Sequence, residues 1–342
     1  MDIQKSIMLK KTKTPLLTIL LIVACGSNSN GPGVAKIAEC TPTAINAAPT
    51  QGHVPAASKW LYQLQNLSIG EIKQTGFDIL TIDYSADGSD AEGFTVTDLD
   101  SLHAHSKTAL AYLSIGEAED YRYYFDANWL TTAPCWLGKT NPEWPGNYKV
   151  QYWAEEWQTI VLGYLDKIII AGFDGVYLDI VDAFEYWSDD ENAAGLVIDE
   201  DVAAQRMMQF VQRIARHARI TRGKADFYVF PQNGVRILSY DTSGDFQQTI
   251  SGFGIEDLYY DGTIPVSDAE IHEREPLLID LVTAGKMVLL VDYVDDGSGY
   301  SGANKSRIDD FRNRALARRF VPYVGREDRE LDGVNRIVGV QE

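Results

Sequence analysis

The sequence has few residues that bind metals or redox cofactors. Its 342 residues include 3 Cys and 5 His, with no Cys-x-x-Cys pair and no Cys/His cluster, which argues against a structural zinc site. No Gly-x-Gly-x-x-Gly follows the first predicted strand, so nothing supports a dinucleotide site. We therefore expect neither a metal nor a cofactor. Four of the His fall in predicted helices, where we expect surface or packing roles: His103, His105, His217 and His272.

Basic residues are scarce relative to acidic ones. The chain has 30 Lys and Arg against 49 Asp and Glu, which gives a formal net charge of −19. A strongly acidic surface repels nucleic acid and anionic headgroups, and it attracts cationic partners. We expect no nucleic-acid partner. The alternative is that much of this charge serves only solubility.

The apolar run at residues 16–24 is too short to span a bilayer. Lys10, Lys11 and Lys13 stand just before it, in the order of an export signal. The run closes as Leu-Ile-Val-Ala-Cys-Gly at residues 21–26, which resembles the lipobox of bacterial lipoproteins, where the Cys receives lipid and the chain is cut just before it. We predict a lipoprotein signal peptide at 1–24 and lipidation of Cys25. The alternative is an ordinary signal peptide with a coincidental Cys.

Residues 25–57 are predicted to form a flexible tether and an N-terminal arm, because residues 27–33 are rich in Ser, Asn, Gly and Pro. We predict that the protein is held in the bacterial cell envelope by a lipid anchor, in the outer membrane on its periplasmic or surface face, or that it is secreted. With Cys25 lipidated, Cys40 and Cys135 are left as a candidate disulfide pair in an oxidising compartment.

Short apolar strands alternate with helical patterns along residues 58–342, which predicts a (β/α)8 TIM barrel. The long segment 120–147 is predicted to be a functional loop. The eight predicted strands are 59–65, 77–84, 108–117, 148–153, 172–182, 226–234, 254–260 and 286–293. Predicted helices cover 68–76, 97–106, 155–171, 199–221, 267–284 and 304–320.

Most of the predicted strands end in acid or amide residues. In a barrel these ends meet at one face and build the active site. Clustered carboxylates repel one another, so stability does not explain the pattern, although solvated loop acids are the structural alternative. The residues at the strand ends are Asp83, Glu117, Asp179, Asp182, Gln232, Asn233, Glu256, Asp257 and Asp292.

Two kinds of chemistry use clustered carboxylates: glycoside hydrolysis and binding of hard metal ions. Aromatic residues near the strands favour the first, because sugar rings stack on aromatic faces while hydroxyl and amide groups bind sugar hydroxyls. The tyrosines in or just beyond the strands include Tyr62, Tyr84, Tyr112, Tyr177, Tyr228, Tyr260 and Tyr293.

Four segments, at residues 112–119, 141–148, 172–179 and 254–260, together resemble glycoside hydrolase family 114. They read YLSIGEAE, NPEWPGNY, GFDGVYLD and GIEDLYY, and the resemblance spans about 59–324. It implies a (β/α)8 fold and cleavage of α-1,4-linked galactosamine-containing polysaccharide, as by an endo-α-1,4-polygalactosaminidase. It also implies a catalytic Asp and Glu, which map onto Asp179 and Glu256.

Our hypothesis is that Asp179 is the nucleophile or base and Glu256 the general acid, with the pKa of Glu256 raised by Asp257 and Asp179. The reverse allocation stays open. A cationic amino-sugar polymer would suit the acidic chain. The alternatives are a lipid-anchored carbohydrate-binding barrel without turnover and a hydrolase of another α-glycan. Predicted substrate-binding residues are Tyr62, Asp83, Tyr84, Glu117, Tyr177, Asp182, Gln232, Asn233, Tyr260, Asp292 and Tyr293.

Overall fold

The computed structural model describes residues 37–43 and 48–342. The predicted signal peptide, Cys25 and most of the predicted tether lie outside these residues, so those assignments stay predictions. Within the part that is described, no helix combines the length and the apolar character needed to cross a bilayer.

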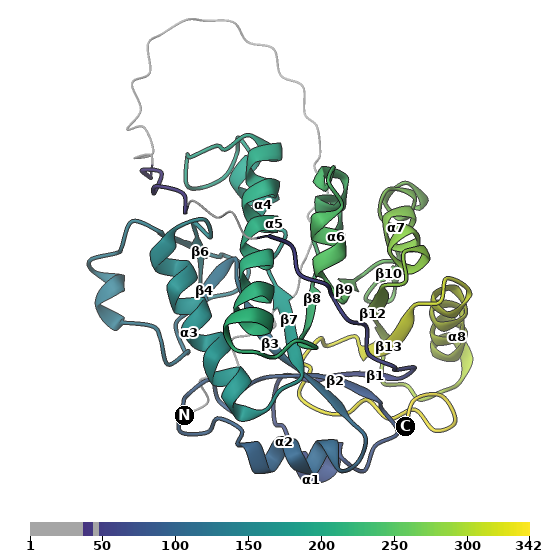
Figure 1. Ribbon diagram of the computed structural model, residues 1–342. Coiled ribbons are helices and arrows are strands. Elements are labelled where there is room, and N and C mark those ends of the chain that lie inside the picture. The colour runs from purple at the N-terminus through teal and green to yellow at the C-terminus, as the bar shows by residue number, and fades with distance from the viewer. Residues whose placement is uncertain (1–36, 44–47) are drawn as a thin grey trace, which may run out of the picture.

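Eight parallel strands among the described residues form the centre of the fold (Figure 1). Five of them pair in the order β1-β2-β3-β7-β8, and three in the order β13-β12-β9. Their bounds are β1 (Trp60–Tyr62), β2 (Ile79–Ile82), β3 (Thr108–Ser114), β7 (Gly175–Asp179), β8 (Tyr228–Pro231), β9 (Gly252–Glu256), β12 (Met287–Asp295) and β13 (Val321–Arg326).

Contacts at both ends of the two sheets bring the strands into barrel order. A parallel bridge between Gln232 and Gly254 joins the end of β8 to β9. At the other seam β1 contacts β13, and the rings of Trp60 and Tyr323 meet edge to face at 6.1 Å. The predicted fold class, an α/β fold of the TIM-barrel type, is confirmed.

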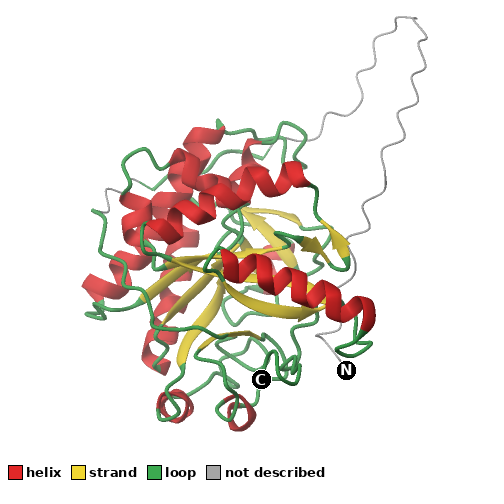
Figure 2. Ribbon diagram, turned by 90° about the vertical axis from the view of Figure 1, so that its right-hand side faces the viewer, coloured by secondary structure: helices red, strands yellow, loops and turns green. Residues whose placement is uncertain are grey.

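Helices surround the strands on the outside, as Figure 2 shows in red against yellow. These helices bury one face, as in α3, whose buried residues recur at helical spacing. The helices are α1 (Ile69–Ile72), α2 (Val96–His103), α3 (Glu155–Ala171), α4 (Ala183–Ser188), α5 (Glu200–Arg216), α6 (Asp245–Thr249), α7 (Asp268–Thr283) and α8 (Gly302–Ala317). Shorter helical turns cover Ala127–Leu130, His217–Thr221 and Val235–Tyr240.

The predicted fourth barrel strand, 148–153, is wrong. Its residues overlap β6 (Asn147–Val150), which pairs antiparallel with β4 (Glu117–Glu119) and β5 (Leu137–Thr140) in a separate sheet. The predicted loop 120–147 therefore carries strand structure. The missing barrel strand is β13, which the sequence analysis did not predict. A further antiparallel pair, β10 (Tyr260–Asp261) and β11 (Ile264–Pro265), follows β9.

A disulfide between Cys40 and Cys135 joins the N-terminal arm to the segment before β5. Gln151 reinforces the junction, because its amide accepts from the Cys40 N–H at 2.7 Å and donates to the Cys135 carbonyl at 3.1 Å. The predicted pairing of the two Cys is thus present in the structure.

Aromatic rings fill the barrel beneath the strand ends. Trp60, Tyr62 and Tyr177 are almost fully buried, with ring centroids 5.3 to 5.8 Å apart. Glycine on β9 makes the space for them, because a Cβ on Gly254 would lie 2.1 Å from the Tyr177 hydroxyl oxygen. The floor of the barrel is therefore packed too tightly to accept an added methyl group at this position.

We expect Gly254→Ala to destabilise the protein. Overpacking a buried site costs roughly 1–3 kcal/mol, and here the added methyl meets a ring held by neighbouring rings. Urea unfolding followed by tryptophan fluorescence measures the change in the free energy of unfolding.

Gly163→Ala is the matched control, because Gly163 lies in α3 with nothing within 4 Å of an added Cβ. Alanine favours a helix interior over glycine by up to about 1 kcal/mol, so this variant should be as stable as the parent or more so. Equal stability of the Gly254→Ala variant and the parent would refute the packing argument.

Candidate active site

A cavity of about 1320 Å³ opens at the C-terminal ends of the barrel strands. This is the end at which the loops of a parallel barrel form its binding site. Eight of the predicted site residues line it: Tyr62, Asp83, Glu117, Asp179, Asp182, Asn233, Glu256 and Tyr293.

Asp179 is the last residue of β7, and its side chain is fixed by two neutral donors. The Tyr112 hydroxyl donates to Oδ2 at 2.6 Å, and the Ile180 N–H donates to Oδ1 at 2.8 Å. Burial raises the pKa of the Asp179 carboxyl well above its usual value, and the charge of Glu256 raises it further. From the sequence we expected a raised pKa at Glu256.

Glu256 is the last residue of β9, and neutral donors fix it as well. The Tyr293 hydroxyl donates to Oε1, and the Asn233 amide donates to Oε2 at 3.0 Å. The Glu256 N–H in turn donates to the Asn233 amide oxygen at 3.2 Å. Asn233 therefore binds both the backbone and the side chain of Glu256.

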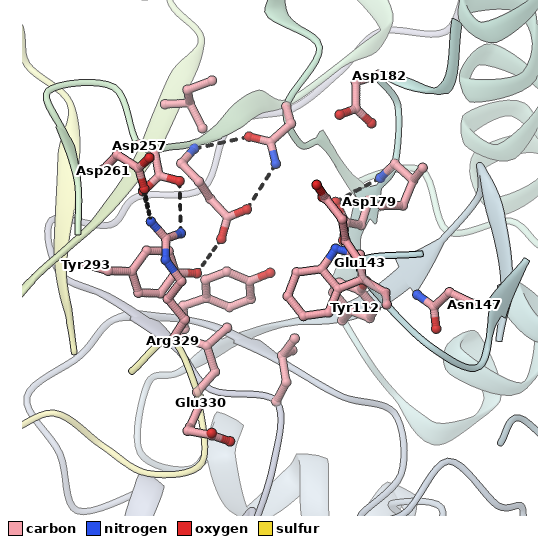
Figure 3. A pocket seen from close by; sticks show the side chains of 18 of the residues that line it. Tyr112, Glu143, Asn147, Asp179, Asp182, Asp257, Asp261, Tyr293, Arg329 and Glu330 are labelled. Carbon is pink, nitrogen blue, oxygen red and sulfur yellow. Dashed lines mark hydrogen bonds and ion pairs between the residues drawn. The ribbon is translucent and has the colours of Figure 1, made fainter. Parts of the chain in front are cut away.

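The two carboxyls face one cavity. Tyr62 lines the same cavity, and burial together with the charges of Glu256 and Asp179 raises the pKa of its hydroxyl. Figure 3 shows Tyr112 and Asp179 on one side and Tyr293 with Arg329 on the other. The arrangement places two titratable carboxyls across a shared space.

The backbone is strained just past the strands that carry these groups. Ile180, Asn233 and Asp257 all have φ between 51° and 60°, a region that non-glycine residues seldom enter. Ile180 is β-branched, which makes its conformation a clear outlier. Such strain is concentrated at functional sites, because the surrounding structure has to hold it in place.

Two of the predicted sugar-binding acids already have cationic partners. Arg122 binds both oxygens of Asp83, at 2.7 and 2.8 Å, and donates to Glu119 at 2.7 Å. Glu117 is fully buried and pairs with Lys149 at 2.5 Å. Both acids line the cavity. Their charges are paired with Arg122 and Lys149, whereas we expected them to pair with the amines of the substrate.

Five predicted substrate-binding residues are absent from the described cavity wall: Tyr84, Tyr177, Gln232, Tyr260 and Asp292. Tyr177 points the same way as Asp179 but lies two residues below it, in the packed floor. Gln232 is buried there too and accepts from the Tyr62 hydroxyl at 3.1 Å. These two residues support the site from beneath.

The other three are bound elsewhere. Tyr84 packs edge to face on Tyr164 at 5.4 Å, and the Tyr260 hydroxyl donates to Asp310 at 2.8 Å. Asp292 is fully buried and accepts from the backbone N–H groups of residues 258, 259 and 260, each at 2.9 Å. Asp292 thus fixes the loop that follows Glu256, and we withdraw its assignment to sugar binding.

Sequence reasoning missed the cations of the site, Arg122, Lys149 and Arg329. Arg329 follows β13 and binds Asp257 through two contacts of 2.9 Å and Asp261 through one of 2.6 Å. The apolar run 320–324 was a usable signal for β13, but Pro322 interrupts it and lowers its strand propensity. Among the described residues, no group of three or more His, Cys, Asp or Glu is placed to hold a metal ion.

We expect the protein to lose stability between pH 5 and pH 8. Burial raises the pKa of Asp257 to about 6 and those of Asp292 and Glu185 to about 7. Across this window the folded chain holds more protons than the unfolded chain, so the free energy of unfolding falls as the pH rises. Urea unfolding at several pH values should show a loss of the order of a few kcal/mol, most of it from Asp257 and Asp292. Glu185 contributes less, because its side chain is 37% exposed and solvent screens its charge.

The Asp292→Asn variant serves as the control, because it removes one of these titrating groups. Its stability should depend less steeply on pH than that of the parent. A free energy of unfolding that rises from pH 5 to pH 8 would contradict the assignment of raised pKa values.

Sequence relatives of the chain are found in distant organisms. It is 47% identical over 276 residues to an uncharacterized protein of Methanocaldococcus jannaschii, covering 81% of this chain and 78% of that one. It is 44% identical over 292 residues to an uncharacterized protein of Thermotoga maritima, covering 85% and 88%.

Two solved structures share the fold. The glycoside hydrolase domain of PelA from Pseudomonas aeruginosa has a TM-score of 0.59 at 16% identity, covering 82% of this chain and all of that one. Aspergillus fumigatus Ega3 in complex with galactosamine has a TM-score of 0.59 at 17% identity, covering 84% and 97%. The family model for glycoside-hydrolase family GH114 matches residues 41–341, and the chain therefore belongs to glycoside hydrolase family GH114.

Proposed function

We propose that the protein hydrolyses α-1,4-linked galactosamine-containing polysaccharide, with Asp179 and Glu256 as its catalytic pair. One observation carries the proposal. Asp179 and Glu256 accept hydrogen bonds from neutral hydroxyl and amide donors, whereas the neighbouring Asp83, Glu117 and Asp257 pair with cations.

A neutral donor places no positive charge beside a carboxyl, whereas a bound arginine or lysine favours its ionised form. Glycoside hydrolysis needs one carboxylic acid to protonate the leaving oxygen and one carboxylate to act as nucleophile or base. Burial raises the pKa of Asp179 and the charge of Glu256 raises it further, so release of a proton from Asp179 depends on the charge of its partner.

The charge of the cavity supports a cationic substrate. Among the described residues that line it, 18 are Asp or Glu and 6 are Lys or Arg. Polymers of galactosamine carry amines and are cationic at mildly acidic pH, so this surface would attract them. Trp144 also lines the cavity, half-buried, and offers an aromatic face to a sugar ring. The solved Ega3 complex contains galactosamine.

We expect Asp179→Asn and Glu256→Gln each to lower kcat by at least about a thousandfold, because each removes a group that acts in the transition state. Release of reducing ends from de-N-acetylated α-1,4-linked galactosamine polymer measures the rate. Asp280→Asn is the control, because Asp280 is an exposed acid on α7 outside the cavity wall. Near-normal rates in either test variant would rule out this pairing.

In a retaining enzyme, the configuration of the product formed with azide assigns the two roles. Azide that takes the place of the missing nucleophile gives a glycosyl azide of inverted configuration, whereas azide that attacks the covalent intermediate in the variant without the acid/base gives one of retained configuration. The same assay tests the alternatives. A carbohydrate-binding barrel retains the polymer without releasing new ends, and a hydrolase of another α-glycan cleaves α-linked polymers that lack amines at a higher rate.

We also propose that the mature protein is anchored to the bacterial cell envelope by lipid on Cys25. The lipobox-like segment at residues 21–26 supports this placement. Radiolabelled palmitate should enter the expressed full-length protein, and Cys25→Ser should abolish both this labelling and recovery in the membrane fraction. Secretion of the unlabelled parent protein would instead fit an ordinary signal peptide.

A further inference from the structure

Arginine covers both of the tyrosines that donate to the catalytic pair. The guanidinium carbon of Arg329 lies 4.4 Å from the centre of the Tyr293 ring, and the Tyr293 hydroxyl donates to Glu256. On the other side, Arg122 lies 6.0 Å from the centre of the Tyr112 ring, and the Tyr112 hydroxyl donates to Asp179.

Arg329 is held in place from several directions. Its guanidinium binds both oxygens of Asp257 at 2.9 Å and Asp261 at 2.6 Å, and its side chain is 24% exposed. Its backbone adopts a φ of 60°. Two residues later, the Leu331 carbonyl accepts from the N–H groups of residues 64 and 65, which follow β1. Figure 3 shows Arg329 between the two acids and the Tyr293 ring.

A cation over the face of a phenol withdraws electron density from the ring and makes its hydroxyl a stronger hydrogen-bond donor. The side-chain contacts of Arg329 are with Asp257, Asp261 and the Tyr293 ring, and Tyr293 is the one of these three that binds the Glu256 carboxyl. We propose that Arg329 is a positioning residue for Glu256, and that it acts through Tyr293. This inference rests on the proposed function.

The simplest alternative is that Arg329 only neutralises Asp257 and so stabilises the loop after β9. The two explanations predict different effects of an Arg329 substitution when the Tyr293 hydroxyl is absent. A residue that acts through Tyr293 has no further effect once the hydroxyl is gone, whereas a structural residue affects the enzyme with or without that hydroxyl.

The test compares Arg329→Met, Tyr293→Phe and the double variant in the full-length enzyme, with de-N-acetylated galactosamine polymer as substrate. Arg329→Met should lower kcat about tenfold or more and change KM less than about threefold. Tyr293→Phe should lower kcat at least as much. The double variant should be no more than about twofold slower than Tyr293→Phe.

The pH profile is the second readout. Loss of Arg329 weakens the hydrogen bond that favours ionised Glu256, so one limb of the kcat/KM profile should move to higher pH by roughly half a unit or more. The groups that face Glu256 are Asp179 and Tyr177 of β7, Tyr62 of β1, Tyr293 of β12, and Asp257 beside Arg329.

Arg329→Met also leaves Asp257 without its cationic partner. The variant Asp257→Asn/Arg329→Met distinguishes the effect of an unpaired Asp257 from the effect on Tyr293. It removes both charges of the pair, and the limb should still move to higher pH relative to Asp257→Asn alone. If this variant recovers the parent profile, Arg329 acts only on Asp257 and the proposal is overturned.

Arg314→Met is the matched control. Arg314 lies 4.1 Å from the centre of the Tyr259 ring, and the Tyr259 hydroxyl donates to Glu275 at 2.8 Å, a similar arrangement outside the cavity wall. It should change neither kcat nor the profile. Additive effects of Arg329→Met and Tyr293→Phe would overturn the proposal. Active Glu256→Gln would instead overturn the proposed function on which it rests.

Discussion

Carboxylates crowded at one end of the barrel, several of them buried, are the constraint on which this structure depends. A buried carboxylate is costly unless it is paired or fully hydrogen-bonded. The protein meets this requirement by different means at different acids. Asp83 binds an arginine through two contacts, Glu117 binds a lysine, and Asp292 accepts from three backbone amides. Asp83 and Glu117 lie in the cavity wall and Asp292 fixes the loop that follows Glu256, whereas Asp179 and Glu256 are bound by neutral donors.

The packing below the site serves the same end. Rings from β1 and β7 fill the barrel under the two carboxyls, and Gly254 on β9 admits the Tyr177 ring at a distance that no side chain would allow. A floor of this kind has few alternative rotamers, so the strand ends above it cannot shift independently. The precision that a carboxyl pair requires is therefore supplied by aromatic packing as much as by hydrogen bonds.

The sequence predicted the barrel, but with one strand exchanged for another. Segment 148–153 has the length and composition of a strand, and residues 148–150 belong to one, β6, but in an antiparallel sheet. Local pattern indicates extended structure without indicating the pairing partner, which is set by tertiary packing. β13 was missed because Pro322 interrupts its apolar run. The count of eight was right because one error offset the other.

The same limit explains the errors at the site. Residues two apart on a strand face the same way, so a sequence places Tyr177 and Asp179 on one side without telling floor from cavity. Arg122 and Arg329 were missed for another reason. They lie 39 and 72 residues from their partners Asp83 and Asp257. The sequence around an arginine does not indicate which acid it will bind. An acidic site is visible in sequence because its acids stand at strand ends. The cations that pair with these acids come from a loop, from β6 and from the chain beyond the last strand, so only the three-dimensional structure reveals them.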